Sequence, residues 1–202
     1  MTVGRAATRR ASGIAVLVSV LAAAASAADG QAGAEALVTP PGVQATLFAA
    51  EPLLSSPADV DVDARGRVWV CEVVNYRGKR ETRPEGDRIL VLEDTDGDGA
   101  ADRQTVFHQG REVDSALGIC VIGEGPGRKV IVSCAPDVFV FHDDDGDLEA
   151  DRRETLFTNT GLPQHDHSVH AFVVGPDGRW YFNFGNTGKA CLLYTSDAAD
   201  EE

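Results

Sequence analysis

A ten-residue segment rich in aspartate occurs twice in this chain, each time between two short apolar runs. Residues 94–103, DTDGDGAADR, return as residues 143–152, DDDGDLEADR. An apolar run precedes each copy, and a run ending in phenylalanine follows it, at Phe107 and at Phe157. Strand, turn and strand units that recur along a chain indicate a fold made of stacked copies of one small antiparallel sheet.

Short runs of β-branched and aromatic residues between turn residues predict the strands, and no helical period of useful length appears. The expected strands cover 58–62, 68–74, 89–93, 105–107, 117–122, 130–133, 138–142, 154–157, 169–174 and 180–184. VDVDARGRVWV (60–70) and FVVGPDGRWYF (172–182) open the first and third units in the same way. We predict an all-β fold, a β-propeller fragment with two complete blades and the start of a third. A β-sandwich is the alternative.

The two ends of the chain differ from its middle. Early arginines, an apolar run over 14–25 and the small-residue pattern Ala25-Ser26-Ala27 predict a signal peptide over 1–27, and therefore export to the periplasm or cell envelope. An uncleaved N-terminal anchor is the alternative, and Arg9-Arg10 permits twin-arginine export. We expect residues 28–42 to form a flexible leader and residues 43–190 to form the partial propeller. Residues 191–202 resemble the translation of a sequencing-library adapter, and we expect them not to be native.

The formal net charge of −14 argues against nucleic acid and anionic membrane surfaces as partners. Any membrane association would have to come from regions outside this chain. Cys71, Cys120 and Cys134 lie in strand-like runs, which favours buried thiols. A disulfide between two of them is the alternative.

Aspartates at alternate positions around glycines bring several carboxylates to one centre, as in sites for Ca²⁺. The candidate metal ligands are Asp94, Asp96, Asp98 and Asp102 in the first segment and Asp143, Asp145, Asp147, Asp151 and Glu154 in the second. Both segments lie between strands, so we do not expect an EF-hand. Hairpin turns in which Asp and Gly satisfy the local backbone are the open alternative, and either role is structural.

Three of the five histidines lie in the segment His165-Asp166-His167-Ser168-Val169-His170. Side chains two apart on a strand share a face, so His165 and His167 would converge on a metal, or one would act as a base that Asp166 orients. Ordinary surface histidines are the alternative.

Several motifs, in order, resemble the membrane-bound dehydrogenase family of bacteria. They are EPL (51–53), GRVWVCE (66–72), DRILVLEDTDGDG (87–99) and QHDH (164–167) followed by GPDG (175–178). The resemblance implies a large exported β-propeller, often followed by a c-type haem domain, that passes electrons from a sugar or alcohol to the haem or to a cytochrome.

That family is similar to the soluble quinoprotein sugar dehydrogenases, which implies pyrroloquinoline quinone as cofactor. The similarity implies that His167 is the general base with Asp166 beside it, and that His165 and His170 lie near the cofactor. Ala171 stands where those enzymes have an arginine.

Two other functions remain open. One is a non-catalytic, calcium-stabilised propeller that binds carbohydrate or protein, and the other is a lactonase-like hydrolytic propeller with histidine metal ligands. Glu72, Asn75 and Tyr76 follow a predicted strand and are expected either to face a central channel or to lie at a solvent edge.

Overall fold

The computed structural model describes residues 34, 36–76, 82–162 and 168–185. These residues form ten strands and one short 3₁₀ helix. The elements are β1 (Pro57–Val62), β2 (Val68–Glu72), β3 (Asp87–Glu93), β4 (Arg103–Gly110), η1 (Arg111–Val113), β5 (Gly118–Ile122), β6 (Arg128–Cys134), β7 (Asp137–Asp143), β8 (Arg152–Phe157), β9 (Val169–Val174) and β10 (Trp180–Phe184). The all-β prediction is confirmed, and every predicted strand overlaps an observed one. The predicted signal peptide and residues 191–202 lie outside the described residues.

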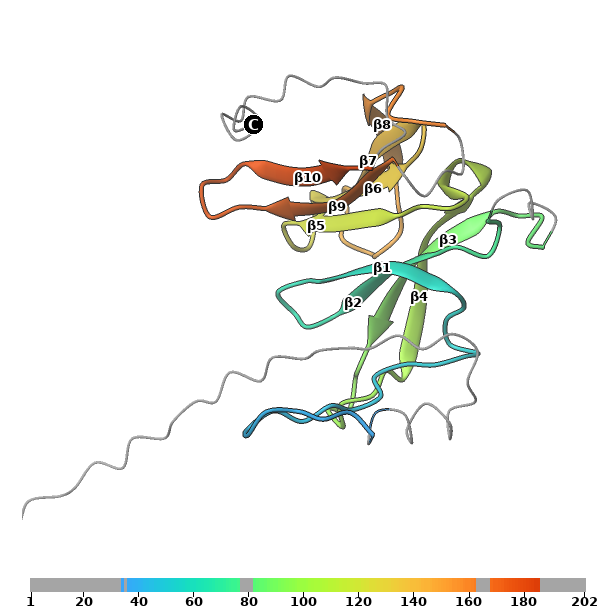
Figure 1. Cartoon of the computed structure of the whole chain (residues 1–202). Helices are drawn as coiled ribbons and strands as arrows, with labels where there is room; N and C mark the ends of the chain where they lie inside the picture. Colours follow the sequence, from blue (N-terminus) through green and yellow to red (C-terminus); the bar gives the residue numbers. More distant parts are fainter. Residues whose placement is uncertain (1–33, 35, 77–81, 163–167, 186–202) are drawn as a thin grey trace, which may run out of the picture.

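The strands form three antiparallel sheets in chain order (Figure 1). The first sheet has the order β1-β2-β3-β4, the second β5-β6-β7-β8, and the third pairs β9 with β10. Each four-stranded sheet is a meander, because strands that follow one another in the chain lie side by side and run in opposite directions. The described residues do not form a closed ring, and the three sheets are compatible with a fragment of a β-propeller.

The first strands of the three sheets, β1, β5 and β9, lie side by side at the centre of the molecule (Figure 1). β1 and β5 are joined through side chains. The Asp59 carboxylate (Oδ2) accepts a hydrogen bond from the Ile119 amide at 2.9 Å, and Asp61 (Oδ2) accepts one from Val121 at 2.6 Å. The two aspartates are two residues apart on β1, and the amides that they bind are two residues apart on β5 in the same order. The two strands therefore run in the same direction.

Three apolar clusters hold the sheets together. The largest lies between the first and second sheets, where Trp69 and Phe107 meet edge to face with ring centroids 5.0 Å apart. A second lies between the second sheet and the β9-β10 pair, around Phe172. The third covers the other face of the first sheet, where Phe48 and Leu54 pack on it. Each four-stranded sheet is therefore buried on the face toward its neighbour, as stacked blades require.

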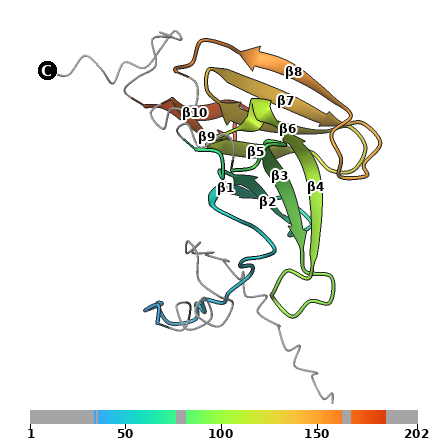
Figure 2. The ribbon, with the colours of Figure 1, turned by 90° about the vertical axis from the view of Figure 1, so that its right-hand side faces the viewer.

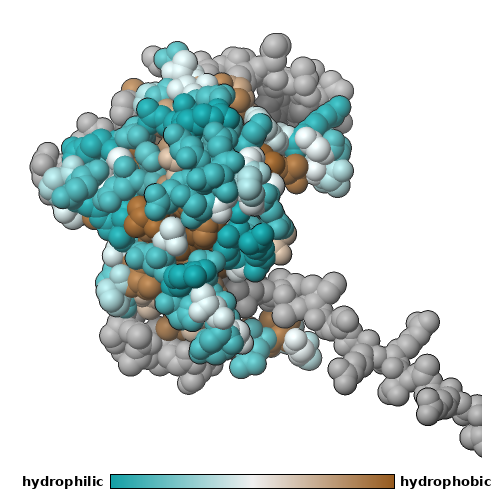
Figure 3. All heavy atoms as spheres, turned by 180° about the vertical axis from the view of Figure 1, so that it is seen from behind, coloured by the Kyte–Doolittle hydropathy of each residue, from teal (hydrophilic) through white to brown (hydrophobic). Residues whose placement is uncertain are grey.

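Most of the surface seen from behind is hydrophilic, with apolar atoms in separate patches (Figure 3). On the β9-β10 pair four large apolar side chains remain at least 42% exposed: Val173, Val174, Trp180 and Tyr181. No helix among the described residues is long and apolar enough to span a bilayer.

The connections between strands divide between two ends of the molecule (Figure 2). Successive antiparallel strands reverse direction, so the β1-β2, β3-β4, β5-β6 and β7-β8 turns lie at one end, here named the turn end. The remaining links, including those from β4 to β5 and from β8 to β9, lie at the opposite end, here named the connection end. Both aspartate segments lie at the turn end, and His170 lies near the connection end, just after the start of β9.

Candidate functional site

The first aspartate segment is a turn that its own carboxylates hold closed. Asp94 accepts hydrogen bonds from the backbone amides of Gly97 at 2.7 Å and Gly99 at 2.9 Å. The bond from Gly99, with those of neighbouring amides, lowers the pKa of Asp94. Asp102 accepts bonds from both the amide (3.1 Å) and the hydroxyl (2.6 Å) of Thr95. The carboxylates thus replace the backbone pairing that the turn lacks.

The second aspartate segment repeats this arrangement around a buried ion pair. Asp143 is fully buried, binds the guanidinium of Arg128, and accepts the Gly146 amide at 2.6 Å. Asp151 accepts the Asp144 amide at 2.7 Å, as Asp102 accepts that of Thr95.

Two groups of three carboxylates have oxygens within 4.8 Å of one another, which suits a hard divalent cation. They are Asp94, Asp96 and Asp98 at the first turn, and Asp143, Asp145 and Asp151 at the second. The structure places the other candidate ligands outside these groups. Asp102 binds Thr95, Asp147 accepts the Glu149 amide at 2.8 Å, and Glu154 pairs with Arg152 and with His142 at 3.4 Å. Calcium binding by the two groups remains a prediction.

Leu148 occupies the place that Gly99 has in the first turn, and both residues have positive φ, 72° and 92° respectively. A leucine in this conformation is strained, because its Cβ approaches the backbone carbonyl. Its side chain is only 8% exposed and packs in the cluster between the first two sheets. The second turn therefore also serves as a contact between blades.

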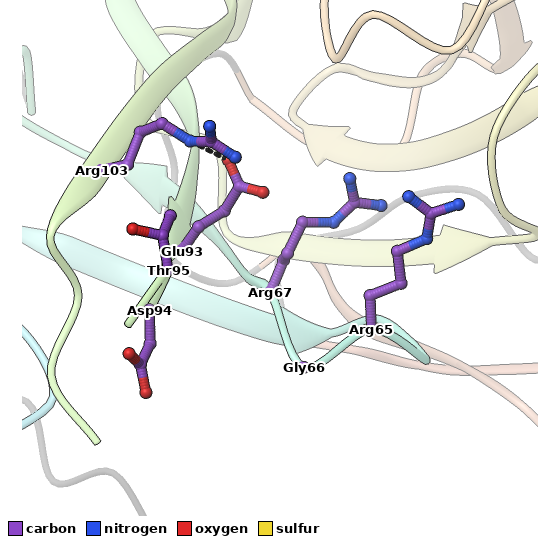
Figure 4. A pocket seen from close by; sticks show the side chains of 7 residues that line it. All are labelled: Arg65, Gly66, Arg67, Glu93, Asp94, Thr95 and Arg103. Carbon is purple, nitrogen blue, oxygen red and sulfur yellow. Dashed lines mark hydrogen bonds and ion pairs between the residues drawn. The ribbon is translucent and has the colours of Figure 1, made fainter. Parts of the chain in front are cut away.

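An open depression of about 270 Å³ lies beside the first turn (Figure 4). Three arginines and two acids line most of it: Arg65, Arg67, Arg103, Glu93 and Asp94. Arg103 pairs with Glu93 at 2.7 Å, and the buried Arg67 pairs with Asp63 at 2.7 Å. Because these cations already have carboxylate partners, the depression is part of the ionic scaffold of the turn end.

A buried polar network fixes the long β2-β3 link at the connection end. Asp87 is fully buried and accepts backbone amides from Val74, Asn75 and Ser115, each at 3.0 Å. Burial raises the pKa of Asp87 despite these bonds. The Asn75 amide group donates to Asp114 at 3.0 Å, which ties the link to the segment before β5.

Glu72 forms a second buried centre beside this network. Its carboxylate accepts the Ser55 amide at 2.6 Å and pairs with Arg83 (2.5 Å) and Arg88 (2.6 Å). Glu72 and Asn75 are fully buried, so both expectations for them, channel lining and a solvent edge, are wrong. A buried carboxylate is tolerated only when it is fully paired. The arginines that pair with Glu72 lie far from it in the sequence, so no local pattern indicates its burial. Tyr76 is half-buried.

His170 and Ala171 lie in a β-bulge of the innermost strand of the third sheet. The pairing register with β10 shifts here, and Ala171 has φ 42°. A Cβ on Gly118 would lie 2.8 Å from the Ala171 amide nitrogen and 3.3 Å from the His170 carbonyl carbon. The missing side chain of Gly118 therefore permits β9 to approach β5. Bulges of this kind redirect side chains and occur often beside functional sites.

The bulge brings His170 within electrostatic reach of Asp59. Burial raises the pKa of Asp59, and the Ile119 amide that donates to its carboxylate acts in the opposite direction, as does the weaker influence of His170. Asp59 binds Ile119, the residue next to Gly118, so the carboxylate and the bulge meet at the same point of β5. Sequence reasoning did not select Asp59. Its alternation with Asp61 was visible, but its partner lies sixty residues away along the chain.

These groups do not by themselves fit a quinone with three carboxylates. The described groups near the bulge include the carboxylates of Asp59 and Asp61, the imidazole of His170, the methyl group of Ala171 and the Ser133 hydroxyl, which lies beside Gly118. An anionic quinone requires cations or strong donors around it. His165, Asp166 and His167, the other residues selected for this site, lie outside the described residues.

The three cysteines that the structure describes, Cys71, Cys120 and Cys134, are buried free thiols, as predicted. Burial raises the pKa of Cys71 and Cys134 strongly and that of Cys120 to about 11. At neutral pH none of them is a thiolate, so they belong to the packing and not to the chemistry.

Comparison with known proteins gives a family and a set of distant structures. The fold is similar to the holo form of the pyranose dehydrogenase PQQ domain from Coprinopsis cinerea, with a TM-score of 0.48 and 19% identity over 72% of this chain and 32% of that one. It is also similar to a calcium structure of a family AA12 carbohydrate-active enzyme from Trichoderma reesei, with a TM-score of 0.44 and 15% identity over 65% of this chain and 29% of that one. The chain thus spans about a third of the length of these proteins.

No curated protein matches the chain. A family model matches residues 30–201, which is most of the sequence. The chain belongs to the family described as a domain of unknown function, DUF7133.

Proposed function

We propose that this chain is part of an exported β-propeller that oxidises a hydroxyl group of a sugar or alcohol at the connection end. One observation carries the proposal. β9, which carries His170 beside its bulge, packs on β5, whose Ile119 amide binds Asp59, and His165, Asp166 and His167 directly precede β9 in the sequence. The aspartate turns lie at the opposite end, so they take the structural role in this proposal.

Oxidation of an alcohol to a carbonyl removes a hydroxyl proton and a hydride. An imidazole suits the proton transfer, because its ordinary pKa lies near neutrality, and a nearby carboxylate stabilises the imidazolium that forms. His167 remains the predicted base, with Asp166 beside it. Asp59 lies on β1, the first strand of the first sheet, and His170 lies on β9, the first strand of the third. The hydride requires a two-electron acceptor, and the sequence resemblance points to a quinone whose carboxylates would be bound by cations from outside the described residues.

The test uses the full-length product of the gene, supplied with Ca²⁺ and pyrroloquinoline quinone. Reduction of a redox dye is followed with a panel of aldoses and simple alcohols. We expect activity with at least one of them and a loss in kcat of about 100-fold or more in His167→Gln. His108→Gln is the matched control, because His108 lies on the outermost strand of the first sheet and pairs with Glu112. Absence of dye reduction with every substrate, or equal activity of both variants, would show the proposal to be wrong.

A second candidate is a non-catalytic propeller that calcium stabilises and that binds carbohydrate or protein. The two carboxylate groups at the turn end favour it. In that case the full-length product binds an oligosaccharide array or a protein partner with no oxidation of any bound sugar, and His167→Gln leaves binding unchanged.

A further inference from the structure

The segment before β1 repeats the sequence of the outermost strands. Residues 105–107 of β4 read TVF, residues 155–157 of β8 read TLF, and residues 46–48 again read TLF. In the first two cases the motif belongs to the fourth strand of a blade. Residues 46–48 have no strand partner among the residues that the structure describes.

A backbone hydrogen bond places residues 46–48 in the same position relative to an aspartate turn. At the second turn, the Ala150 amide donates to the carbonyl of Phe107 on the preceding blade at 2.9 Å. At the first turn, the Ala101 amide donates to the carbonyl of Phe48 at 2.7 Å. Ala101 and Ala150 occupy the same place in the two copies of the aspartate segment. The Phe48 carbonyl therefore contacts the aspartate turn of the first sheet in the same way as the Phe107 carbonyl contacts that of the second.

The chain after Phe48 follows the path of the chain after Phe107. Each phenylalanine is followed, at the same distance, by a buried apolar residue and then by a serine with positive φ. These are Leu54 and Ser56 (φ 44°) in the first case and Val113 and Ser115 (φ 65°) in the second. Positive φ is uncommon for serine, so its recurrence at matching positions marks the same link between a fourth strand and the next blade.

The packing agrees with this equivalence. Phe107 and Val113 belong to the cluster between the first and second sheets. Phe48 and Leu54 pack on the opposite face of the first sheet, against Val68 and Leu90 among others. Residues 46–56 therefore cover the first sheet as the outer part of a preceding blade would.

From these observations we infer that residues 46–49 are the outermost strand of a blade whose other three strands belong to a later part of the same polypeptide. The strand that pairs with them is of the β3 and β7 type, largely apolar and buried on both faces. This pairing would close the ring of blades. β1, β5 and β9 follow one another about a common centre, so later blades approach the free face of the first sheet, where residues 46–49 lie. The inference does not depend on the proposed function.

Amide hydrogen exchange at single-residue resolution tests the inference, in the 202-residue chain and in the full-length product of the gene. An outermost strand is paired along one edge only, so alternate amides within 46–49 should be protected. We expect these amides to exchange about 100-fold more slowly or better in the longer protein, and rapidly in the 202-residue chain. The amides of β3 are the control, because they are paired in both proteins.

Three results would overturn the inference. The first is equally rapid exchange at 46–49 in both proteins, and the second is a gene that encodes no further strands. The third is protection in the 202-residue chain that rises with protein concentration, together with a dimeric mass in light scattering. That result would assign the partner strand to a second copy of the chain.

Discussion

Leu148 permits a quantitative test of how the second aspartate turn balances strain against burial. Its φ of 72° is unfavourable for any residue with a Cβ, by about 1–2 kcal/mol, whereas its side chain is buried between the first two sheets. Truncation of a buried leucine to alanine costs about 2.7–5 kcal/mol. Leu148→Ala keeps the strain and loses the packing, so we expect a loss of about 3 kcal/mol in the free energy of unfolding.

Leu148→Gly loses the same packing but relieves the strain. Glycine adopts positive φ freely, so we expect it to be about 1 kcal/mol more stable than the alanine variant, although less stable than the native chain. This order is the reverse of that at most buried positions. Gly99→Ala is the matched control. A Cβ at Gly99 meets no atom within 4 Å, so its expected cost of about 1 kcal/mol is conformational alone.

Urea denaturation of the purified variants, followed by tryptophan fluorescence, measures these differences. Trp69 reports on the relevant core, since it is fully buried against Phe107 in the same cluster as Leu148. The reasoning fails if Leu148→Gly is as unstable as Leu148→Ala or more so, or if Gly99→Ala costs nothing.

Three further predictions concern metal, pH and thiols. Calcium at ten times its dissociation constant should stabilise the chain by about 1.4 kcal/mol for each of the two carboxylate groups in calorimetry; Asp145→Asn should remove the share of the second group, whereas Asp144→Asn, outside that group, should retain it. Burial raises the pKa of Asp63, but the bonds from Trp69 and Arg67 outweigh it and hold the pKa below its ordinary value. Its stabilising contribution is therefore present above about pH 4 and lost as the pH falls through the folded pKa; Asp63→Asn should show a shallower loss of stability in that acid range, and an unchanged acid limb would contradict this. In mass-spectrometric mapping at pH 8, alkylation of Cys71 and Cys134 should require denaturant, and rapid labelling of the native chain would disprove their burial.

The strands were accessible from sequence because their signal is local. β9 and β10 begin and end at the predicted residues, since alternating apolar residues and glycine turns mark both ends. β4 is longer than expected, from Arg103 to Gly110, because its polar residues still pair with β3. The closed turns around Asp94 and Asp143 were likewise foreseen from the aspartate and glycine spacing.

The connection end could not be predicted in this way, because its contacts join distant parts of the chain. Asp87 binds Ser115, and Asn75 binds Asp114, and although Asp87 opens the 87–99 motif, nothing in the sequence near either residue indicates its partner. Glu72 was selected, but its burial depends on two arginines that only the folded link brings close. Sequence patterns report which face of a strand is apolar, and they do not report which charges meet across a fold.

The side-chain bonds between β1 and β5 determine how the join between the first two sheets responds to acid. The Asp59 and Asp61 carboxylates join β1 to β5, the first strands of the first two sheets. The raised pKa of Asp59 means that it takes up a proton earlier than an ordinary aspartate as the pH falls. Each sheet is held by backbone bonds that do not titrate. A group whose pKa is higher in the folded state stabilises the fold as it takes up its proton, so the join between the first two sheets should persist in mild acid, with the apolar cluster between them intact.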